Sequence, residues 1–582
     1  MTNLPPPGAP PLARRWSLVG GAVCLLLLTV LHTWPLASNP AGLSRNDSAD
    51  TMLNEWIVSW VAHQLTTDPR HLFDANIFHP HRDTLAYSEP LIVLGIFAAP
   101  LSWMGASPVL TYNLLLLSGF FLTGLAMCAA VTVWTGDRMA GVLAGALLAF
   151  NAHTLTRLPH LQAIHVEWIP LALWALDRLV SGRRTRDAMW LSLFVTLLAL
   201  TSGYSTVITL VALGTALAAY SPTWWGRQAA PLAARLALAA AVTVLVVWAV
   251  LWPYRRVQLE EGFERQLESV GMFSATPWSY LVTGGTLHFS TWSHEIYRVK
   301  SSEVLFPGVT AVGLSLVALF GRRTLSTRDR RFVYLAVGLA GFVLSLGTAT
   351  PVYGWLYALF PPLQSIRAPA RFGYLVLLAV AVLAGIGLAE LRRRWPGRAA
   401  TAIGMAAISL ATIEVFQAPF AYRRFNGFPE FYRILAEDPE PGAVVEVPLY
   451  GRRFAFLNAK YLLASTQHWR PLLNGYSGMT PVDYDEVARS LAEFPSRETM
   501  EDLRRRGVKY IVLHAGDYRD PARSRQVLRA LNQMTDVERR ATSGDIRLYR
   551  LRSEEEVLAL DVDLARTTAE SEATPVTLDD PP

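Results

Sequence analysis

Long apolar runs separated by short polar segments fill the first 416 residues. The first run is 17–36, and others follow at 109–134, 139–153, 164–180, 187–203, 205–220, 230–252, 304–320, 332–347, 373–391 and 399–416. A bilayer crossing needs about 20 mostly apolar residues. The pattern therefore predicts an α-helical polytopic membrane protein with about eleven transmembrane helices.

One further apolar run, Leu91 to Trp103, is shorter and contains Pro100. A run of this length does not reach across the hydrocarbon core, and an internal proline interrupts a helix. We expect it to be re-entrant or interfacial and to belong to the first external loop.

The pattern changes after residue 416. Strand-like runs at 443–448, 508–513 and 546–549 alternate with helical stretches such as 499–507. This alternation predicts a small α/β domain over residues 417–569. Residues 570–582 are rich in Thr, Glu, Asp and Pro, which favours a disordered tail.

Composition agrees with the apolar pattern: 52% of the residues are hydrophobic and 17% are charged. A soluble globular protein carries about 25% charged residues, so a soluble enzyme and a disordered chain are both excluded. The net charge of +6 does not indicate a nucleic-acid binder, because residues 417–582 carry 23 basic and 26 acidic side chains. The basic excess lies in the short loops of the apolar part.

Those basic loops fall on alternate connections, at 137–138, 183–186, 225–227, 321–331 and 391–398. Cytoplasmic loops are enriched in Lys and Arg. We therefore expect a cytoplasmic N-terminus and an extracytoplasmic C-terminal domain in a bacterial inner or plasma membrane. The transmembrane part, 1–416, would then carry three long external loops, at 37–108, 253–302 and 347–372.

The first external loop opens with an acidic segment. Asp47 and Asp50 stand at the N-terminal end of a predicted helix at 49–64, whose Trp-bearing face suits the headgroup region along the membrane surface. A carboxylate here has two readings. It either caps the helix or serves chemistry at the membrane face.

An acidic residue just after the first transmembrane helix, a long first external loop, about ten further spans and an external C-terminal domain together resemble the C-fold (GT-C) membrane glycosyltransferases. That group includes oligosaccharyltransferases, protein O-mannosyltransferases and the lipid A aminoarabinose transferase. The resemblance implies that Asp47, or else Asp50, is the general base. The segments 74–81 and 85–89, with His79, His81 and Glu89, are similar to those of uncharacterised bacterial members, and we take these three as candidate sugar or acceptor ligands.

The second external loop contains His160, His165 and Glu167. Ionisable side chains at a membrane face are costly unless paired, so these three are candidate sugar or acceptor ligands, with a structural polar network as the alternative. His and carboxylate groups also bind divalent ions, which leaves a divalent metal cofactor open, although the spacing matches no closed metal motif.

The third loop carries Arg367 and Arg371, which stand out in an otherwise apolar external segment. A guanidinium has a permanent charge and a fixed fork of donors, which suits a phosphate. We expect these arginines, with Arg255 as a further candidate, to bind the donor phosphate; snorkelling toward lipid phosphates is the alternative.

In the tail, three polar-aromatic residues, Trp469, Asn474 and Tyr476, are candidates for stacking on a sugar and bonding its hydroxyls. The other interpretation of this stretch is a turn that packs the tail.

The expected function is transfer of a sugar from a polyprenyl-phosphate-linked donor to a hydroxyl of a glycan, lipid or protein acceptor, within membrane lipids and on the extracytoplasmic face. The alternative is a non-catalytic or transport protein that handles a lipid-linked glycan. Charges away from helix ends are few, which favours chemistry at the external face over conduction.

Overall fold

The computed structural model describes residues 11–262, 267–299, 301, 303–321 and 329–572. The chain divides into two compact units. Unit 1 contains residues 1–66 and 89–425, and unit 2 contains residues 67–88 and 426–582. The predicted basic loop at 321–331 lies mostly outside the described residues, as does the tail after residue 572.

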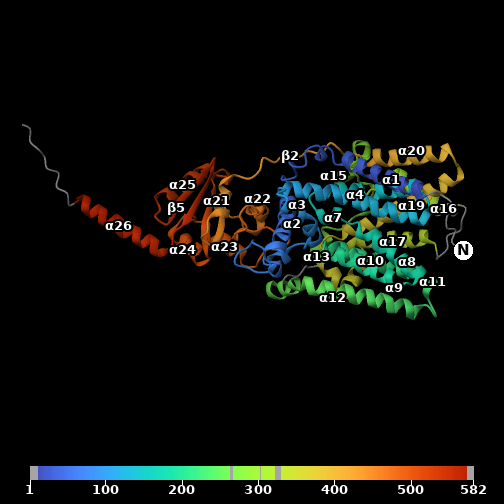
Figure 1. Ribbon diagram of the computed structural model, residues 1–582, viewed down its shortest axis with the longest axis horizontal. Coiled ribbons are helices and arrows are strands. Elements are labelled where there is room, and N and C mark those ends of the chain that lie inside the picture. The colour runs from blue at the N-terminus through green and yellow to red at the C-terminus, as the bar shows by residue number, and fades with distance from the viewer. Residues whose placement is uncertain (1–10, 263–266, 300, 302, 322–328, 573–582) are drawn as a thin grey trace, which may run out of the picture. The chain divides into compact units, whose positions relative to one another are not determined.

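Unit 1 is helical. The longer helices of unit 1 are α1 (Pro11–His32), α2 (Ala49–Thr67), α3 (Ile92–Trp103), α4 (Pro108–Thr135), α5 (Arg138–Ala149), α8 (Trp168–Gly182), α9 (Thr185–Ala199), α10 (Gly203–Ala219), α12 (Ala229–Glu261), α16 (Val309–Phe320), α17 (Arg330–Ser345), α18 (Pro351–Leu359), α19 (Gly373–Arg394) and α20 (Arg398–Val415). Many of these helices, α4, α8, α10 and α12 among them, have roughly parallel axes (Figure 1).

Shorter helices lie in the connections of unit 1. They are α6 (Ala152–Leu155), α7 (Leu161–Ile164), α11 (Ser221–Trp224), α13 (Leu267–Gly271), α14 (Thr286–His288) and α15 (His294–Val299), with the 3₁₀ turn η8 (Pro369–Phe372).

Helix α19 is central to the core of unit 1 and packs against α5, α16 and α17. Small residues allow the close approach, because a Cβ added at Gly387 would lie 1.9 Å from the Leu314 carbonyl oxygen of α16. The core is thus built from helix pairs in close backbone contact.

Within the described residues, four helices are long and apolar enough to cross a bilayer, namely Pro108–Thr135, Ala229–Glu261, Pro369–Arg394 and Arg398–Val415. Shorter apolar helices lie at 19–32, 92–103, 138–149, 203–219 and 309–320. The chain is an integral membrane protein. The count of about eleven crossings, and the re-entrant reading of α3, stay predictions.

Helix α2 appears where a helix is predicted, but its burial differs from the expectation. A helix on the membrane surface would leave one face exposed. Residues 53–62 of α2 are instead buried on every side, including the polar Asn54 and Glu55. The expectation of an amphipathic surface helix is wrong, because the residues between the tryptophans are buried as fully as the tryptophans themselves.

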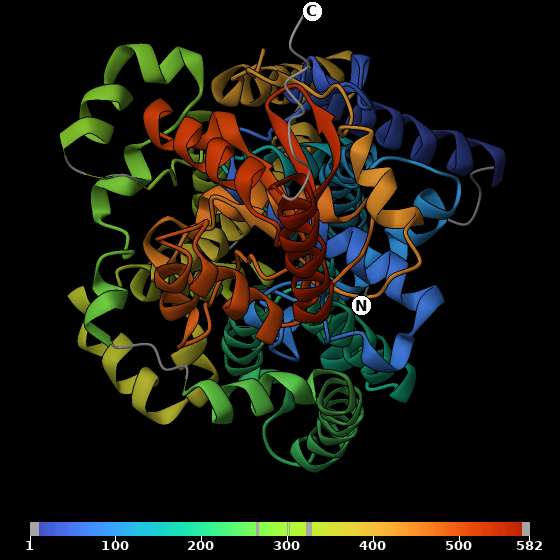
Figure 2. The ribbon, with the colours of Figure 1, turned by 90° about the vertical axis from the view of Figure 1, so that its left-hand side faces the viewer.

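Unit 2 contains a four-stranded mixed sheet in the order β3-β4-β6-β5. The strands β3 and β4 run parallel, whereas β6 is antiparallel to both of its neighbours. Helices, coloured orange to dark red in Figure 2, surround the strands. The elements are β3 (Ala443–Val447), β4 (Val508–His514), β5 (Val537–Ser543), β6 (Ile546–Leu551), α21 (Phe431–Glu437), α22 (Ala459–Ser465), α23 (Tyr484–Ser490), α24 (Arg497–Arg505), α25 (Pro521–Gln533) and α26 (Glu554–Glu572).

Residues 67–88, from the predicted first external loop, are part of unit 2. The backbone N–H of Leu472 donates to the Asn76 carbonyl (2.7 Å), and the N–H of His79 donates to the Leu472 carbonyl (3.0 Å). A segment from the front of the chain therefore adds backbone hydrogen bonds to a domain formed mainly by residues after 425.

Candidate functional site

Asp50 stands in the first turn of α2 and faces the second predicted external loop. Its Oδ2 lies 3.4 Å from Nε2 of His160. The loop is fastened to α2 one turn further on, because the Asn54 side-chain oxygen accepts from the backbone N–H of Leu161 (3.2 Å). The Asp50 side chain remains 42% exposed, so it is accessible to a reacting hydroxyl.

Asp47 has a different setting, since its carboxylate accepts from Nε of Arg45 at 3.1 Å within its own loop. Glu55, which follows in α2, is fully buried. With the Asn46 amide oriented so that its nitrogen faces Glu55, this nitrogen donates to both Glu55 carboxylate oxygens, at 3.0 and 3.1 Å. Burial raises the pKa of Glu55 well above its usual range, which favours the neutral acid.

The second loop adds a buried cation to this region. Arg157 forms an ion pair with Glu303 (Nη2 to Oε2, 3.1 Å), and both side chains are largely covered. His153 lies close by. Burial, reinforced by the charges of Arg157 and Arg371, holds the pKa of His153 well below its usual range. His153 is therefore neutral at physiological pH. We call Asp50, His153, Arg157, His160 and Glu303 the Asp50 cluster.

A second group, the Arg371 cluster, consists of Glu89, Tyr204, Arg367 and Arg371. The Arg371 guanidinium lies 4.3 Å from the ring centroid of Tyr204. The backbone N–H of Arg367 donates to the Tyr204 hydroxyl (2.9 Å). The two arginines predicted to bind phosphate are thus both held by one tyrosine at the start of α10.

Glu89 is bound by the same helix start, because its carboxylate accepts from the backbone N–H of Gly203 (2.7 Å) and of Tyr204 (3.4 Å). Burial raises the pKa of Glu89, while the Gly203 N–H and the Arg371 charge oppose that rise. The positive charge of Arg371 thus lowers the pKa of both Glu89 and His153. The two clusters therefore lie within electrostatic reach of each other.

An apolar groove opens between α9, α10 and α12. It has a volume of about 740 Å³, and aliphatic residues with Trp248 and Trp252 line most of it. Its lining on α12 runs from Leu236 to Gln258, a rise of about 33 Å, which is close to the thickness of a hydrocarbon core.

One end of the groove is polar. Tyr254, Arg255 and Gln258 line it, and Arg255 donates to the Gln258 side-chain oxygen (2.9 Å). The Glu89 carboxylate interacts electrostatically with the Tyr254 hydroxyl at this end. The polar end therefore lies within electrostatic reach of Glu89 in the Arg371 cluster.

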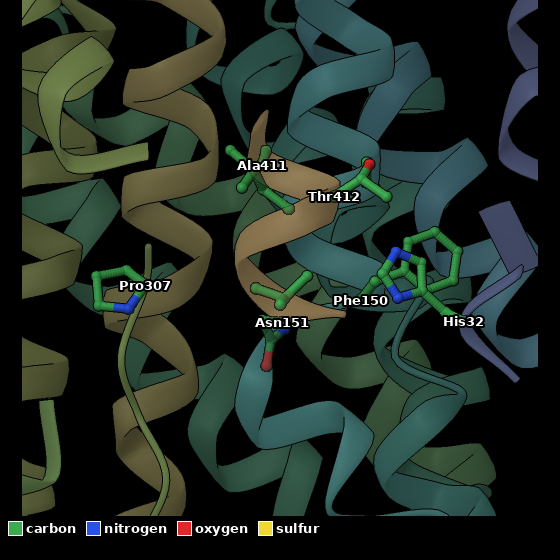
Figure 3. Close-up of a pocket in the computed structure, with 9 residues that line it drawn as sticks. His32, Phe150, Asn151, Pro307, Ala411 and Thr412 are labelled. Atoms are coloured by element: carbon green, nitrogen blue, oxygen red, sulfur yellow. The ribbon is translucent and has the colours of Figure 1, made fainter. Parts of the chain in front are cut away.

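A second, much smaller pocket lies at the end of α1 (Figure 3). His32 stacks on Phe150 there, with 4.7 Å between ring centroids, and Asn151 and Thr412 complete the polar lining. The volume of about 10 Å³ admits a single water molecule at most. No sugar fits this pocket.

His165 and Glu167 are buried and pair with each other (Nδ1 to Oε1, 3.0 Å). The other ring nitrogen of His165 donates to the Leu115 carbonyl of α4 (2.9 Å). These contacts are those of the structural network that the sequence left open, and a sugar or acceptor role for the two residues stays a prediction.

The remaining candidates lie in unit 2. His79 Nε2 donates to the Arg506 carbonyl (3.0 Å), and His81 Nε2 lies 2.9 Å from an Asp483 carboxylate oxygen. Asn474 is fully buried and bonds the backbone N–H and carbonyl of Glu446. Trp469 and Tyr476 are half-buried.

Sequence reasoning overlooked three residues of the site. Tyr204 lies between the apolar runs 187–203 and 205–220 and carries no charge that would mark it. Arg157 and Glu303 come from two different loops, and neither residue by itself indicates that it forms an ion pair with the other. The available signal at Tyr204 was Ser202, whose side chain caps α10 by accepting from the Ser205 N–H (3.1 Å).

Within the described ranges, no group of three or more His, Cys, Asp or Glu side chains is placed to hold a metal ion. The site as built from this chain offers paired acids and bases and a pair of arginines, which suit proton transfer and anion binding.

No protein-family model and no curated protein matches the sequence. Some solved structures are similar to the structure of this chain. The ArnT protein of Cupriavidus metallidurans bound to undecaprenyl phosphate is 12% identical over 94% of this chain and 99% of its own, with a TM-score of 0.48. The Archaeoglobus fulgidus oligosaccharyltransferase, in a complex with Zn and sulfate, is 16% identical over 86% of this chain and 68% of its own, with a TM-score of 0.45. Both neighbours are C-fold glycosyltransferases, the group that the sequence resembles.

Proposed function

We propose that the chain is an inverting membrane glycosyltransferase that uses a polyprenyl-phosphate-linked sugar. The observation that carries the proposal is an apolar groove, long enough for a lipid tail, whose polar end lies within electrostatic reach of Glu89 in the Arg371 cluster. A lipid-linked donor has the same two parts, an extended apolar chain and a phosphate.

In this proposal the lipid tail of the donor lies along α12, and Arg371, with Arg367 and Arg255, holds its phosphate. A guanidinium stabilises the charge that develops on the leaving phosphate oxygen. Tyr204 and Glu89 position Arg371, since one supports its guanidinium and the other balances its charge.

The acceptor hydroxyl attacks the anomeric carbon from the face opposite the phosphate. Its oxygen forms the new glycosidic bond, its proton passes to the Asp50 carboxylate, and the bond between the anomeric carbon and the phosphate oxygen breaks with its electron pair leaving on polyprenyl phosphate. His160 orients Asp50 from a distance of 3.4 Å. Asp47 is the second candidate for the base.

We place this chemistry on the extracytoplasmic face, with the N-terminus in the cytoplasm and unit 2 outside, in line with the basic loops. We assign His79, His81 and Asn474 structural roles, because their hydrogen bonds lie within unit 2. The stacking of Trp469 and Tyr476 on a sugar stays a prediction. We assign His165 and Glu167 the role of fixing the second loop on α4.

Binding of undecaprenyl phosphate to the purified full-length protein in detergent, measured by native mass spectrometry, tests the donor site. We expect Arg371→Ala to weaken binding at least tenfold. Arg433→Ala should not alter it, because Arg433 is an exposed arginine of unit 2 paired with Glu430. Equal affinity in both variants would remove the phosphate role.

Release of polyprenyl phosphate from a polyprenyl-phosphate sugar distinguishes an enzyme from a transport protein. We expect the purified protein to release it when membrane-derived acceptors are supplied. A protein that binds the donor lipid, moves it across proteoliposomes and never releases polyprenyl phosphate would be a transporter.

A further inference from the structure

Unit 2 carries an exposed basic and aromatic surface, which we call the Phe454 patch. It consists of Arg453, Phe454 and Phe456 in the 3₁₀ segment η9 (Arg452–Asn458) and of Arg519 after β4. Phe454 is 39% and Phe456 46% exposed, with 6.4 Å between their ring centroids. Two large aromatic side chains in contact with solvent and with each other form an apolar surface that burial elsewhere would stabilise.

Two guanidinium groups flank the ring of Phe454. That of Arg453 lies 5.5 Å and that of Arg519 5.3 Å from its centroid. A cation against an aromatic face is held in place by the ring quadrupole, so both charges are kept beside the exposed rings.

The charge of these two arginines is not neutralised by a carboxylate. Among the described residues, nearby Arg452 pairs with Asp485 and Lys460 pairs with Asp517, whereas neither Arg453 nor Arg519 forms an ion pair. The patch therefore combines apolar surface with net positive charge.

This combination matches the headgroup layer of a bilayer. Aromatic rings are enriched at that depth, and an anionic leaflet attracts basic residues near its surface. Neither the apolar groove nor the small pocket at the end of α1 includes a patch residue, and the two phenyl rings of the patch are exposed, which suits a broad surface better than an enclosed small ligand.

Unit 2 is also joined to the membrane unit at three points of the chain, after residues 66, 88 and 425. Such tethering keeps the local concentration of membrane surface high, so even a weak contact is populated.

We propose that the Phe454 patch docks unit 2 on the phosphate-bearing headgroups of an anionic lipid surface. The phenyl rings enter the interface while Arg453 and Arg519 bind lipid phosphates. This docking is independent of the proposed transferase activity.

The test uses the full chain with Cys24 and Cys128 replaced by Ser, reconstituted in nanodiscs that contain headgroup-nitroxide lipid. An environment-sensitive fluorophore is attached at Phe456→Cys. The matched control is Leu558→Cys, an apolar side chain of α26 that is 63% exposed and lies near Glu554 and Glu555. We expect at least threefold stronger nitroxide quenching at 456 than at 558 in phosphatidylglycerol nanodiscs.

The charges are then tested separately. Arg453→Glu with Arg519→Glu should reduce quenching at 456 at least twofold, and Arg453→Lys with Arg519→Lys should retain it. In the unaltered protein, raising the salt concentration should weaken quenching, because screening shortens the reach of charge. This last measurement needs no substitution of the arginines.

Quenching at 456 no stronger than at 558 would overturn the proposal. So would equal quenching in phosphatidylglycerol and phosphatidylcholine that salt leaves unchanged. A fluorescence shift at 456 that needs no anionic lipid and grows with protein concentration would assign the patch to a protein contact instead.

Discussion

Asp50 and His160, which are 110 positions apart in the chain, face each other with 3.4 Å between the Asp50 carboxylate and Nε2 of the imidazole. Asp47 instead bonds Arg45 of its own loop. The loop that supplies Arg157 and His153 thus approaches Asp50 through His160, which gives Asp50 the better placed carboxylate for taking a proton from an acceptor.

Replacement of Asp50 by Asn should therefore abolish most of the transfer. Loss of a general base lowers turnover by about 100- to 10,000-fold, and donor binding should be unchanged because the phosphate contacts lie elsewhere. Rates of polyprenyl phosphate release and native-mass affinities measure the two effects. Asp47→Asn is the matched variant, with less than a tenfold loss expected; the opposite ranking would assign the base to Asp47.

The buried pair of His165 and Glu167 should matter for stability. Both ring nitrogens of His165 face acceptors, so the pair is held by hydrogen bonds on both sides. Removing one member of a buried pair leaves the other uncompensated, at a cost of about 3–5 kcal/mol.

We expect Glu167→Ala to lower the thermal unfolding midpoint in detergent, and the double change with His165→Ala to lower it by less than the sum of the two single changes. His71→Ala, which removes an exposed histidine paired with Asp68, is the control and should have no effect. Additive losses would show that the two residues do not act as a pair.

His468 should make unit 2 sensitive to acid. Its Nδ1 accepts from the backbone N–H of Arg470 (3.0 Å), and burial, aided by the Arg470 charge, lowers its pKa to about 3. In the unfolded chain this histidine binds a proton below about pH 6.5. The unfolded state therefore holds more protons between these two values, and stability falls as the pH drops below about 6.5.

The loss amounts to about 1.4 kcal/mol per pH unit for one such group. Hydrogen exchange of the peptides that contain β3 and β4 measures it between neutral pH and pH 5. We expect the pH dependence to weaken in His468→Asn and to persist in His71→Asn. An unchanged slope in His468→Asn would mean that other groups dominate.

Local patterns predicted much of this fold. The runs at 443–448, 508–513 and 546–549 are β3, β4 and β6, because alternating branched and apolar residues suit a pleated strand. The acid at the start of α2 and the arginines at 367 and 371 were singled out as candidates for a different reason, because charged residues are conspicuous beside apolar runs.

Pairings between distant segments were not predictable. Nothing in the local sequence states that Tyr204 supports Arg371, or that Arg157 meets Glu303, because such contacts depend on how helices and loops pack. The burial of α2 was missed for a related reason. Trp56 and Trp60 are as compatible with a core as with an interface, and only their packing decides which.

Segment 67–88 is the clearest case of a distant pairing that the local sequence does not predict, and it yields a further prediction. Asn76 is buried in unit 2, where its side-chain nitrogen donates to the Ser465 hydroxyl and to the Arg470 carbonyl, both at 3.1 Å. Asn76→Ala would leave the Arg470 carbonyl without this donor, at a cost of about 1–3 kcal/mol. We therefore expect faster hydrogen exchange in the peptides around residues 465–474, although the substitution lies almost 400 positions earlier.

Asn532→Ala, at an exposed position of α25, is the control and should leave those peptides unaffected. Equal exchange in both variants would mean that residues 67–88 rest on unit 2 without stabilising it.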